Sequence, residues 1–174
     1  EKLLAQDPKN VSVLSRLCAA YRTVNPLKAL EHCRQAADIE PANFNHAIGY
    51  AAALVQAKQH EQAVAILRRV LAVAPDNYTA HANIAASLYQ LKRYPEAVVE
   101  FEWIATKKPD LAVAYYFLGM SYEAVQRYPE AVGSFKKFLS IADPNYNKIE
   151  IENVNLRLPP LVKIVEKIDK KRRN

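Results

Sequence analysis

The chain has 174 residues, of which 51% are hydrophobic and only three are glycine, so its composition predicts an all-α protein. No segment approaches the ~20 uncharged apolar residues of a transmembrane helix, so we expect no membrane span in this sequence. The formal net charge is +6, and six basic minus two acidic residues between positions 163 and 173 supply +4 of it. The charge therefore marks a C-terminal tail rather than a basic binding face.

Three independent sets of residues recur every 34 positions. The prolines are Pro41, Pro75 and Pro109, the small residues are Ala29, Ala63, Ala97 and Ala131, and the larger apolar set is Cys33, Leu67, Phe101 and Phe135. The pentapeptide Tyr-Pro-Glu-Ala-Val also occurs twice with the same spacing, at 94–98 and 128–132. A period shared by unrelated residue sets indicates a repeat protein.

Each period contains two predicted helices joined by a short turn. In the third period, apolar residues recur with helical spacing at Ile84, Ala85 and Leu88, and again at Ala97, Phe101, Ile104 and Ala105. Pro95 suits the first position of the second helix, and Pro109 prevents that helix from continuing. We expect the small side chain of Ala97 where the two antiparallel helices approach most closely.

This pattern resembles the tetratricopeptide repeat. The family places a large residue, a Leu-Gly pair and a Tyr on its first helix, and Ala, an aromatic residue and Ala on its second. The fourth period matches best, through Tyr115, Leu118, Gly119, Tyr122, Ala131, Phe135 and Phe138, and the first has an inter-helix turn one residue shorter. The resemblance implies a right-handed α-solenoid of antiparallel helix pairs, about four repeats long, with a C-terminal capping helix.

The predicted organisation follows this period. Residues 1–9 form the end of a truncated preceding repeat helix, four repeats follow at 10–43, 44–77, 78–111 and 112–145, and 146–174 is a degenerate capping segment with a basic tail. Glu1 to Pro8 looks like the end of a second helix, comparable with Arg69 to Pro75. We therefore expect the chain to begin inside a repeat of a longer protein, whose targeting signal would lie upstream. The sequence favours the cytoplasm only slightly.

Cys18 and Cys33 both fall on helix faces that are predicted to be interior. Their spacing matches no metal-binding motif, and two cysteines do not make a disulfide framework. Because a buried Cys packs as a small hydrophobic side chain, we favour two reduced core cysteines over a bridge between them.

The repeat pattern weakens after Pro144. Residues 145–158 fit both an alternating pattern (Ile149, Ile151) and a helical one (Ile151, Val154, Leu158), and both interpretations stay open. Apolar residues at Leu161, Ile164, Val165 and Ile168 predict an amphipathic helix that begins after Pro159-Pro160. We expect this helix to cover the last repeat. The alternative is that it lies in the binding groove and competes with the partner.

No motif in the sequence predicts catalysis. The four histidines have no second ligand at a metal-binding spacing, and the three glycines are isolated on helices, so we expect no enzyme, no cofactor and no metal. The only feature for nucleic acid is the basic run from Lys170 to Arg173, which is more typical of a solvated helix end. We therefore expect neither nucleic acid nor a membrane as the partner.

The resemblance implies that the first helices line the inner surface of the solenoid. Carried onto this sequence, the inner positions of the first repeat are Ser12, Ser15, Arg16, Ala19, Arg22 and Thr23, and those of the second include Gly49. From the later repeats we predict a partner-binding groove formed by Asn45, Ile48, Ala52, Thr79, Asn83, Ala86, Tyr89, Tyr116, Phe117 and Met120. Asn83 can donate to and accept from a peptide bond, and the fourth-repeat side chains provide apolar area. The alternative is that Phe117 and Met120 pack under the terminal helix.

Tetratricopeptide domains that bind chaperone tails use a carboxylate clamp of Lys, Arg and Asn on three successive repeats. The corresponding positions here provide one Asn, Asn83, and no cation, so we expect no chaperone tail of this kind as the partner. The sequence favours a groove that holds a peptide or helix of another protein. A self-associating scaffold and a regulatory domain of a larger protein, including an enzyme, stay open as alternatives.

Overall fold

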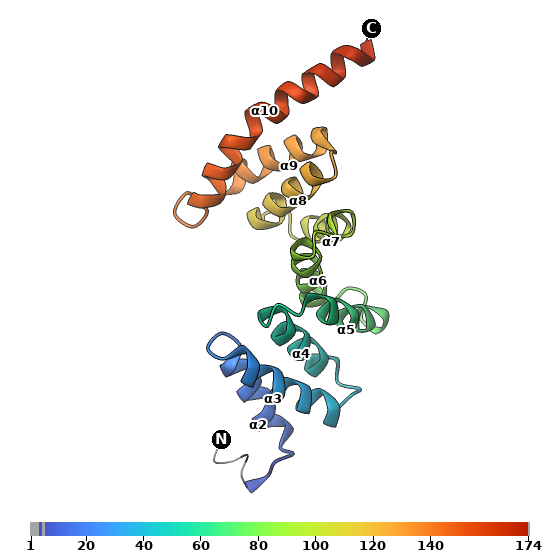
Figure 1. Ribbon diagram of the computed structural model, residues 1–174, viewed down its shortest axis with the longest axis vertical. Helices are drawn as coiled ribbons and strands as arrows, with labels where there is room; N and C mark the ends of the chain where they lie inside the picture. Colours follow the sequence, from blue (N-terminus) through green and yellow to red (C-terminus); the bar gives the residue numbers. More distant parts are fainter. Residues whose placement is uncertain (1–3, 5, 174) are drawn as a thin grey trace. The chain divides into compact units, whose positions relative to one another are not determined.

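The computed structural model describes residue 4 and residues 6–173, and every regular element with bounds in that part of the chain is an α-helix (Figure 1). The chain divides into two compact units, unit 1 at Glu1–Leu91 and unit 2 at Lys92–Asn174. The boundary falls inside the predicted third repeat, 78–111. Of the helix end that we predicted at residues 1–8, positions 1–3 and 5 lie outside the described residues, whereas Leu4 and Gln6 are helical.

Unit 1 consists of successive helices that each pack against the next one. They are α2 (Val11–Tyr21), α3 (Pro26–Ile39), α4 (Phe44–Gln56), α5 (His60–Val73) and α6 (Tyr78–Gln90). In addition to these sequential contacts, α2 contacts α4 and α4 contacts α6. The first helices of the predicted repeats therefore lie side by side within unit 1.

Unit 2 follows the same order of packing. Its helices are α7 (Tyr94–Lys107), α8 (Ala112–Ala124), α9 (Tyr128–Ile141) and α10 (Lys148–Arg173), and each contacts the next. The alanines at the 34-residue spacing, Ala29, Ala63, Ala97 and Ala131, have exposed fractions of 0%, so each of them belongs to the interior of its unit.

Asparagine and proline define where several helices begin. The side chains of Asn10, Asn25, Asn43 and Asn77 accept hydrogen bonds from backbone N–H groups in the first turns of α2, α3, α4 and α6. Each cap satisfies a donor that has no partner inside its own helix. Pro26, Pro95 and Pro129 occupy the first turns of α3, α7 and α9, as predicted for Pro95, because proline needs no hydrogen-bond acceptor there.

Three turns between paired helices contain a residue with positive φ. Lys58, Lys92 and Gln126 have φ angles of 60°, 59° and 61° and are spaced by 34 residues. This left-handed conformation ends the preceding helix and costs a non-glycine residue roughly 1–2 kcal/mol. The turn between α2 and α3, which is one residue shorter, has no such residue.

The structure contradicts our expectation of reduced cysteines. Cys18 on α2 and Cys33 on α3 form a disulfide, with their Cα atoms 4.9 Å apart. Both residues are interior as predicted, with exposed fractions of 6% and 1%. The two residues face each other across the packed helices α2 and α3, and a Cα separation in this range is what a disulfide needs.

The C-terminal segment also differs from the prediction. α10 is one continuous helix that begins at Lys148, so the helical interpretation of residues 145–158 is correct and the predicted start after Pro159-Pro160 is wrong. The prolines deprive the carbonyl groups of Asn155 and Leu156 of their helical donors, but both residues are exposed and water can bond them.

α10 packs against α9, as a capping helix should. Val154 and Leu161 are its buried residues, with exposed fractions of 0% and 4%, whereas Ile164 is 37% exposed. The contact thus depends on residues before the prolines as well as on Leu161, and Ile164 does not contribute as predicted. The C-terminal part of α10 extends past α9 (Figure 1).

Candidate partner-binding surface

Seven of the predicted groove residues lie on two neighbouring helices of unit 1. Asn45, Ile48 and Ala52 are on α4, and Thr79, Asn83, Ala86 and Tyr89 are on α6, which contacts α4. We call this set of seven residues the α4–α6 face. Asn45, Thr79 and Ala86 are exposed and the other four are half-buried, so none of the seven is part of the buried core. None of the seven side chains carries a formal charge at neutral pH.

Asn83 uses part of its hydrogen-bonding capacity within its own helix. Its amide nitrogen donates to the backbone oxygen of Thr79 over 2.8 Å. A side-chain amide has two N–H donors and an oxygen with two lone pairs. One N–H group and the oxygen can therefore still bond the backbone of a bound peptide.

The predicted anchors of the fourth repeat lie in unit 2 and pack against neighbouring aromatic rings. Phe117 stacks on Phe101 of α7, with ring centroids 5.6 Å apart. Tyr116 meets Phe117 edge-on at 5.2 Å and lies against Phe138 of α9 at 5.5 Å. Together with Met120, both residues are half-buried on α8. Because their rings contact the core of unit 2, Tyr116 and Phe117 help to hold its helices together.

α10 approaches the same side of α8. The Nη1 atom of Arg157 donates to both carboxylate oxygens of Glu123, at 3.1 and 3.0 Å. Burial raises the pKa of Tyr116, the nearby carboxylate of Glu150 raises it further, and Arg157 opposes the change. Glu150 and Arg157 both belong to α10, so the terminal helix lies close to Tyr116. Phe117 packs on α7, which differs from the alternative that placed it under the terminal helix.

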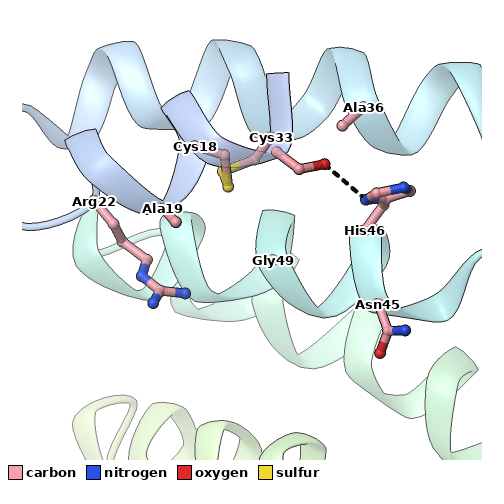
Figure 2. Close-up of a pocket in the computed structure, with 9 residues that line it drawn as sticks. Cys18, Ala19, Arg22, Cys33, Ala36, Asn45, His46 and Gly49 are labelled. Atoms are coloured by element: carbon pink, nitrogen blue, oxygen red, sulfur yellow. Dashed lines mark hydrogen bonds between the residues drawn. A yellow bond between two sulfur atoms is a disulfide. The ribbon is translucent and has the colours of Figure 1, made fainter. Parts of the chain in front are cut away.

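A cavity of about 120 Å³ lies in unit 1 beside the α4–α6 face (Figure 2). α2 contributes Ser15 and Cys18, Arg22 follows the end of α2, α3 contributes Cys33, and α4 contributes His46 and Gly49. Asn45, from the α4–α6 face, also lines the cavity. Several of these residues occupy predicted inner positions of the first two repeats, but the sequence pattern did not predict a cavity between them.

His46 connects α2 to the turn that precedes α4. Its Nδ1 atom lies 3.2 Å from the hydroxyl of Ser15, and its Nε2 atom lies 2.9 Å from the carboxylate of Glu40. Hydrogen bonds from Asn43 and then His46 lower the pKa of Glu40. Sequence reasoning missed this chain of three residues because Ser15 and His46 are 31 positions apart. Only the contact between α2 and α4 brings them together.

The described residues contain neither a metal cluster nor a membrane span. No three His, Cys, Asp or Glu side chains gather there in a way that could hold a metal ion. None of the helices described is both long enough and apolar enough to cross a membrane.

Solved structures of MamA are similar to this chain over most of its length. MamA 41-end from Desulfovibrio magneticus RS-1 is 21% identical, with 94% of this chain and 95% of that chain covered and a TM-score of 0.76. A crystal structure of MamA is 24% identical over 80% of this chain and 82% of that one, with a TM-score of 0.73. MamA AMB-1 is 26% identical over 80% and 86%, with a TM-score of 0.72. These similarities confirm the predicted fold class, an all-α solenoid of paired helices.

Comparison with known families gives the same result at the level of sequence. One family profile described as tetratricopeptide repeat matches residues 25–88 and 54–116, and a second with the same description matches residues 114–147. No curated protein matches the chain. The matched repeats and the shared fold support a protein-interaction scaffold module. The chain belongs to the tetratricopeptide repeat family, which its repeat pattern resembles.

Proposed function

We propose that the chain binds an extended or helical segment of a partner protein on the α4–α6 face and catalyses no reaction. The observation that supports this proposal is the composition and exposure of that face. Ala52 and Ala86 are small enough to let a partner backbone approach closely, and Ala86 is exposed. Asn45 and Asn83 can bond peptide groups, and Ile48 and Tyr89 supply apolar area.

The geometry of the Ser15–His46–Glu40 chain supports a role without catalysis. These residue types occur together in hydrolases, where backbone N–H groups near the nucleophile stabilise the oxyanion. Ser15 lies in the interior of α2, so the N–H groups around it donate to carbonyl oxygens of the same helix. This arrangement provides no pair of amide donors for an oxyanion, and the three residues connect helices instead.

The character of the face also predicts the kind of partner. Its seven side chains carry no formal charge, so we expect a neutral or apolar segment rather than an acidic chaperone tail or a nucleic acid. Binding should then change little with ionic strength, because salt screens only charged contacts. Binding through the basic residues Lys170 to Arg173 would instead weaken steeply as salt increases.

Selection from random peptides tests this proposal and does not require the natural partner. A peptide library displayed on phage is selected on the full chain, and the affinities of the selected peptides are measured for two variants. Ala86→Arg puts a long charged side chain on the α4–α6 face. Ala72→Arg makes the same change at an exposed position of α5 and serves as the matched control.

We expect Ala86→Arg to weaken peptide binding by about 2 kcal/mol, the size of a hot-spot effect. Ala72→Arg should leave the affinity unchanged. Peptides that lose affinity for Ala72→Arg and tolerate Ala86→Arg would place the binding surface on the second helices, contrary to the proposal.

Self-association is a second candidate function, and a different observation favours it. Tyr146, in the turn before α10, and Ile149 and Leu156, in the N-terminal half of α10, are 86%, 72% and 77% exposed. Ile149 and Leu156 are seven residues apart and so lie on one side of the helix. Sedimentation at increasing concentration tests this candidate, with Leu156→Asp as the variant. A dimer that Leu156→Asp dissociates supports self-association, and a monomer at all concentrations excludes it.

A further inference from the structure

The cavity between α2, α3 and α4 exposes one side of the disulfide. Both Cys18 and Cys33 line it, although their exposed fractions are only 6% and 1%. On the other sides the two residues pack with Ala29 and Ala53 in the core, and partly buried side chains, including Tyr21, cover this cluster. A reagent that reaches the disulfide in the folded protein must therefore enter through the cavity, and Cys18 is the more accessible of the two cysteines.

Gly49 keeps this route open. A Cβ atom added to Gly49 would lie 3.7 Å from the sulfur of Cys18, which is ordinary van der Waals contact. The helix backbone at Gly49 does not have positive φ, so neither conformation nor close packing requires a glycine there. What the glycine provides is space, because any longer side chain at this position would extend over the Cys18 sulfur.

The cavity lining includes four polar side chains, Ser15, Arg22, Asn45 and His46, among alanine, glycine and the two cysteines. Arg22 and His46 lie on opposite sides of the disulfide (Figure 2). His46 bonds Ser15 and Glu40 through its two ring nitrogens, whereas the described residues offer Arg22 no ion-pair partner. A guanidinium beside a disulfide attracts carboxylates and favours the negatively charged thiolate form of an attacking thiol.

We propose that this cavity is a thiol-exchange site, in which a small thiol that carries a carboxylate attacks the sulfur of Cys18 and displaces Cys33. Access favours Cys18 over Cys33, Gly49 provides the space for the incoming sulfur, and Arg22 pairs with the carboxylate. A tetratricopeptide fold does not by itself imply such a site, because the site depends on a disulfide and a glycine that belong to this sequence.

The exchange balances without any further oxidant or reductant. The incoming thiolate forms a new sulfur–sulfur bond to Cys18 while the bond between Cys18 and Cys33 breaks, and Cys33 leaves with the electron pair. The apolar core around Cys33 disfavours a thiolate, so the displaced sulfur takes a proton from water. A second thiol can then release Cys18 as a thiol and depart as the disulfide of the two small molecules. In total, two thiols are oxidised and the protein disulfide is reduced.

The first experiment determines which sulfur is attacked. The oxidised full chain is exposed to glutathione, quenched with iodoacetamide, and mapped by mass spectrometry. We expect glutathione on Cys18 and the alkyl group on Cys33. The reverse distribution would overturn the proposal.

The second experiment tests the route of entry with a matched pair of variants. Gly49→Leu fills the space over the Cys18 sulfur, and we expect exchange with glutathione to be about tenfold slower because access limits it. Gly133→Leu is the control, because a Cβ at Gly133 meets no atom within 4 Å and the residue lies on α9 in unit 2. Its exchange rate should match that of the wild type. Equal rates in Gly49→Leu and the wild type would overturn the proposal, since the thiol would then reach the disulfide by another route.

A third experiment tests the charge preference and does not depend on the folding of Gly49→Leu. Exchange rates per thiolate are compared for glutathione and for cysteamine, a small thiol that carries an amine. In the wild type we expect the ratio of the two rates to favour glutathione, and in Arg22→Gln we expect this ratio to fall about fivefold, the effect of one unit charge at ~4 Å in water. A ratio that does not change in Arg22→Gln would remove Arg22 from the proposed site.

Discussion

The helix pairs α2–α3 and α8–α9 are corresponding parts of the repeat pattern. They differ in the residues that fill the space between the two helices of each pair. In α8–α9, Gly119 faces the ring of Phe135, and a Cβ at Gly119 would lie 2.6 Å from two ring carbons. In α2–α3, the corresponding residues are Cys18 and Cys33, and a covalent bond joins them. Phe135 and Cys33 are both almost fully buried, at 0% and 1%.

This difference shows that the repeat requires two helix positions to lie close together. It does not determine which side chains fill the space between them. A glycine against an aromatic ring fills the gap through close packing, which is insensitive to redox conditions. A disulfide fills it with a bond that thiols can break. The pair α2–α3 therefore depends on the redox state of its surroundings, and α8–α9 does not.

The largest expected effect is the loss of the disulfide in α2–α3. Cys18 and Cys33 are separated by 15 residues, and a bridge of this length stabilises a protein by about 3 kcal/mol in the chain-entropy model. Reduction should lower the free energy of unfolding of the wild type by about that amount. Urea unfolding with and without reductant measures this loss of stability. Faster hydrogen exchange in α2 and α3 after reduction would show that the loss falls on these two helices. The variant Cys18→Ala/Cys33→Ala should show no response to reductant, and equal midpoints for the oxidised and reduced wild type would contradict the prediction.

The next effect concerns the close packing in α8–α9. Gly→Ala in an exposed helix normally stabilises by about 0.5–1 kcal/mol. At Gly119 the new methyl group collides with a fully buried ring, so we expect Gly119→Ala to destabilise unit 2 by about 1–3 kcal/mol instead. Gly133→Ala on the exposed side of α9 is the control and should stabilise. Thermal unfolding compares the two variants, and shifts of the same sign would show that Phe135 can move away.

Sequence periodicity predicted the helices and the interior positions well, because both depend on local spacing. The same periodicity contained the evidence for the disulfide, since Cys18 aligns with Gly119 and Cys33 with Phe135, two positions that must approach closely. What it could not provide was the separation of the Cα atoms, 4.9 Å, which depends on how α2 packs on α3. The preference for reduced cysteines was based on their number and on their interior positions, and it did not take this geometry into account.

The candidate site was predicted less completely than the fold. The inner positions of α4 and α6 are partly exposed as expected, because their orientation follows from the helix period. Tyr116 and Phe117 have the same register, are half-buried, and also contact Phe138 and Phe101 within unit 2, so their place in a partner-binding groove stays a prediction. The sequence could not show this, because those contacts and the path of α10 arise only in the folded unit. Two prolines also concealed the continuity of α10.

The smallest expected effect concerns the N-terminal caps of α2 and α8, the first helices of the two pairs. Asn10 caps α2, and its side chain accepts from the backbone N–H of Val13 at 3.1 Å. At the start of α8 the corresponding residue is Leu111, which has no side chain that can cap. The backbone of Leu111, with φ −82° and ψ 95°, already resembles that of Asn10, with φ −68° and ψ 96°. An asparagine at position 111 could therefore cap α8 without any change of backbone.

Leu111→Asn alone would not isolate the cap, because Leu111 is half-buried and its removal also loses apolar contact. Leu111→Ala loses that contact and gains no cap, so the difference between the two variants measures the cap itself. We expect Leu111→Asn to be more stable than Leu111→Ala by about 1 kcal/mol, and Asn10→Ala to destabilise α2 by a similar amount. Urea unfolding of the three variants at one pH measures both differences. If Leu111→Asn and Leu111→Ala have the same midpoint while Asn10→Ala is destabilised, a side-chain cap stabilises α2 but not α8. The two helix pairs would then differ in how their first helices begin, as well as in how their two helices are joined.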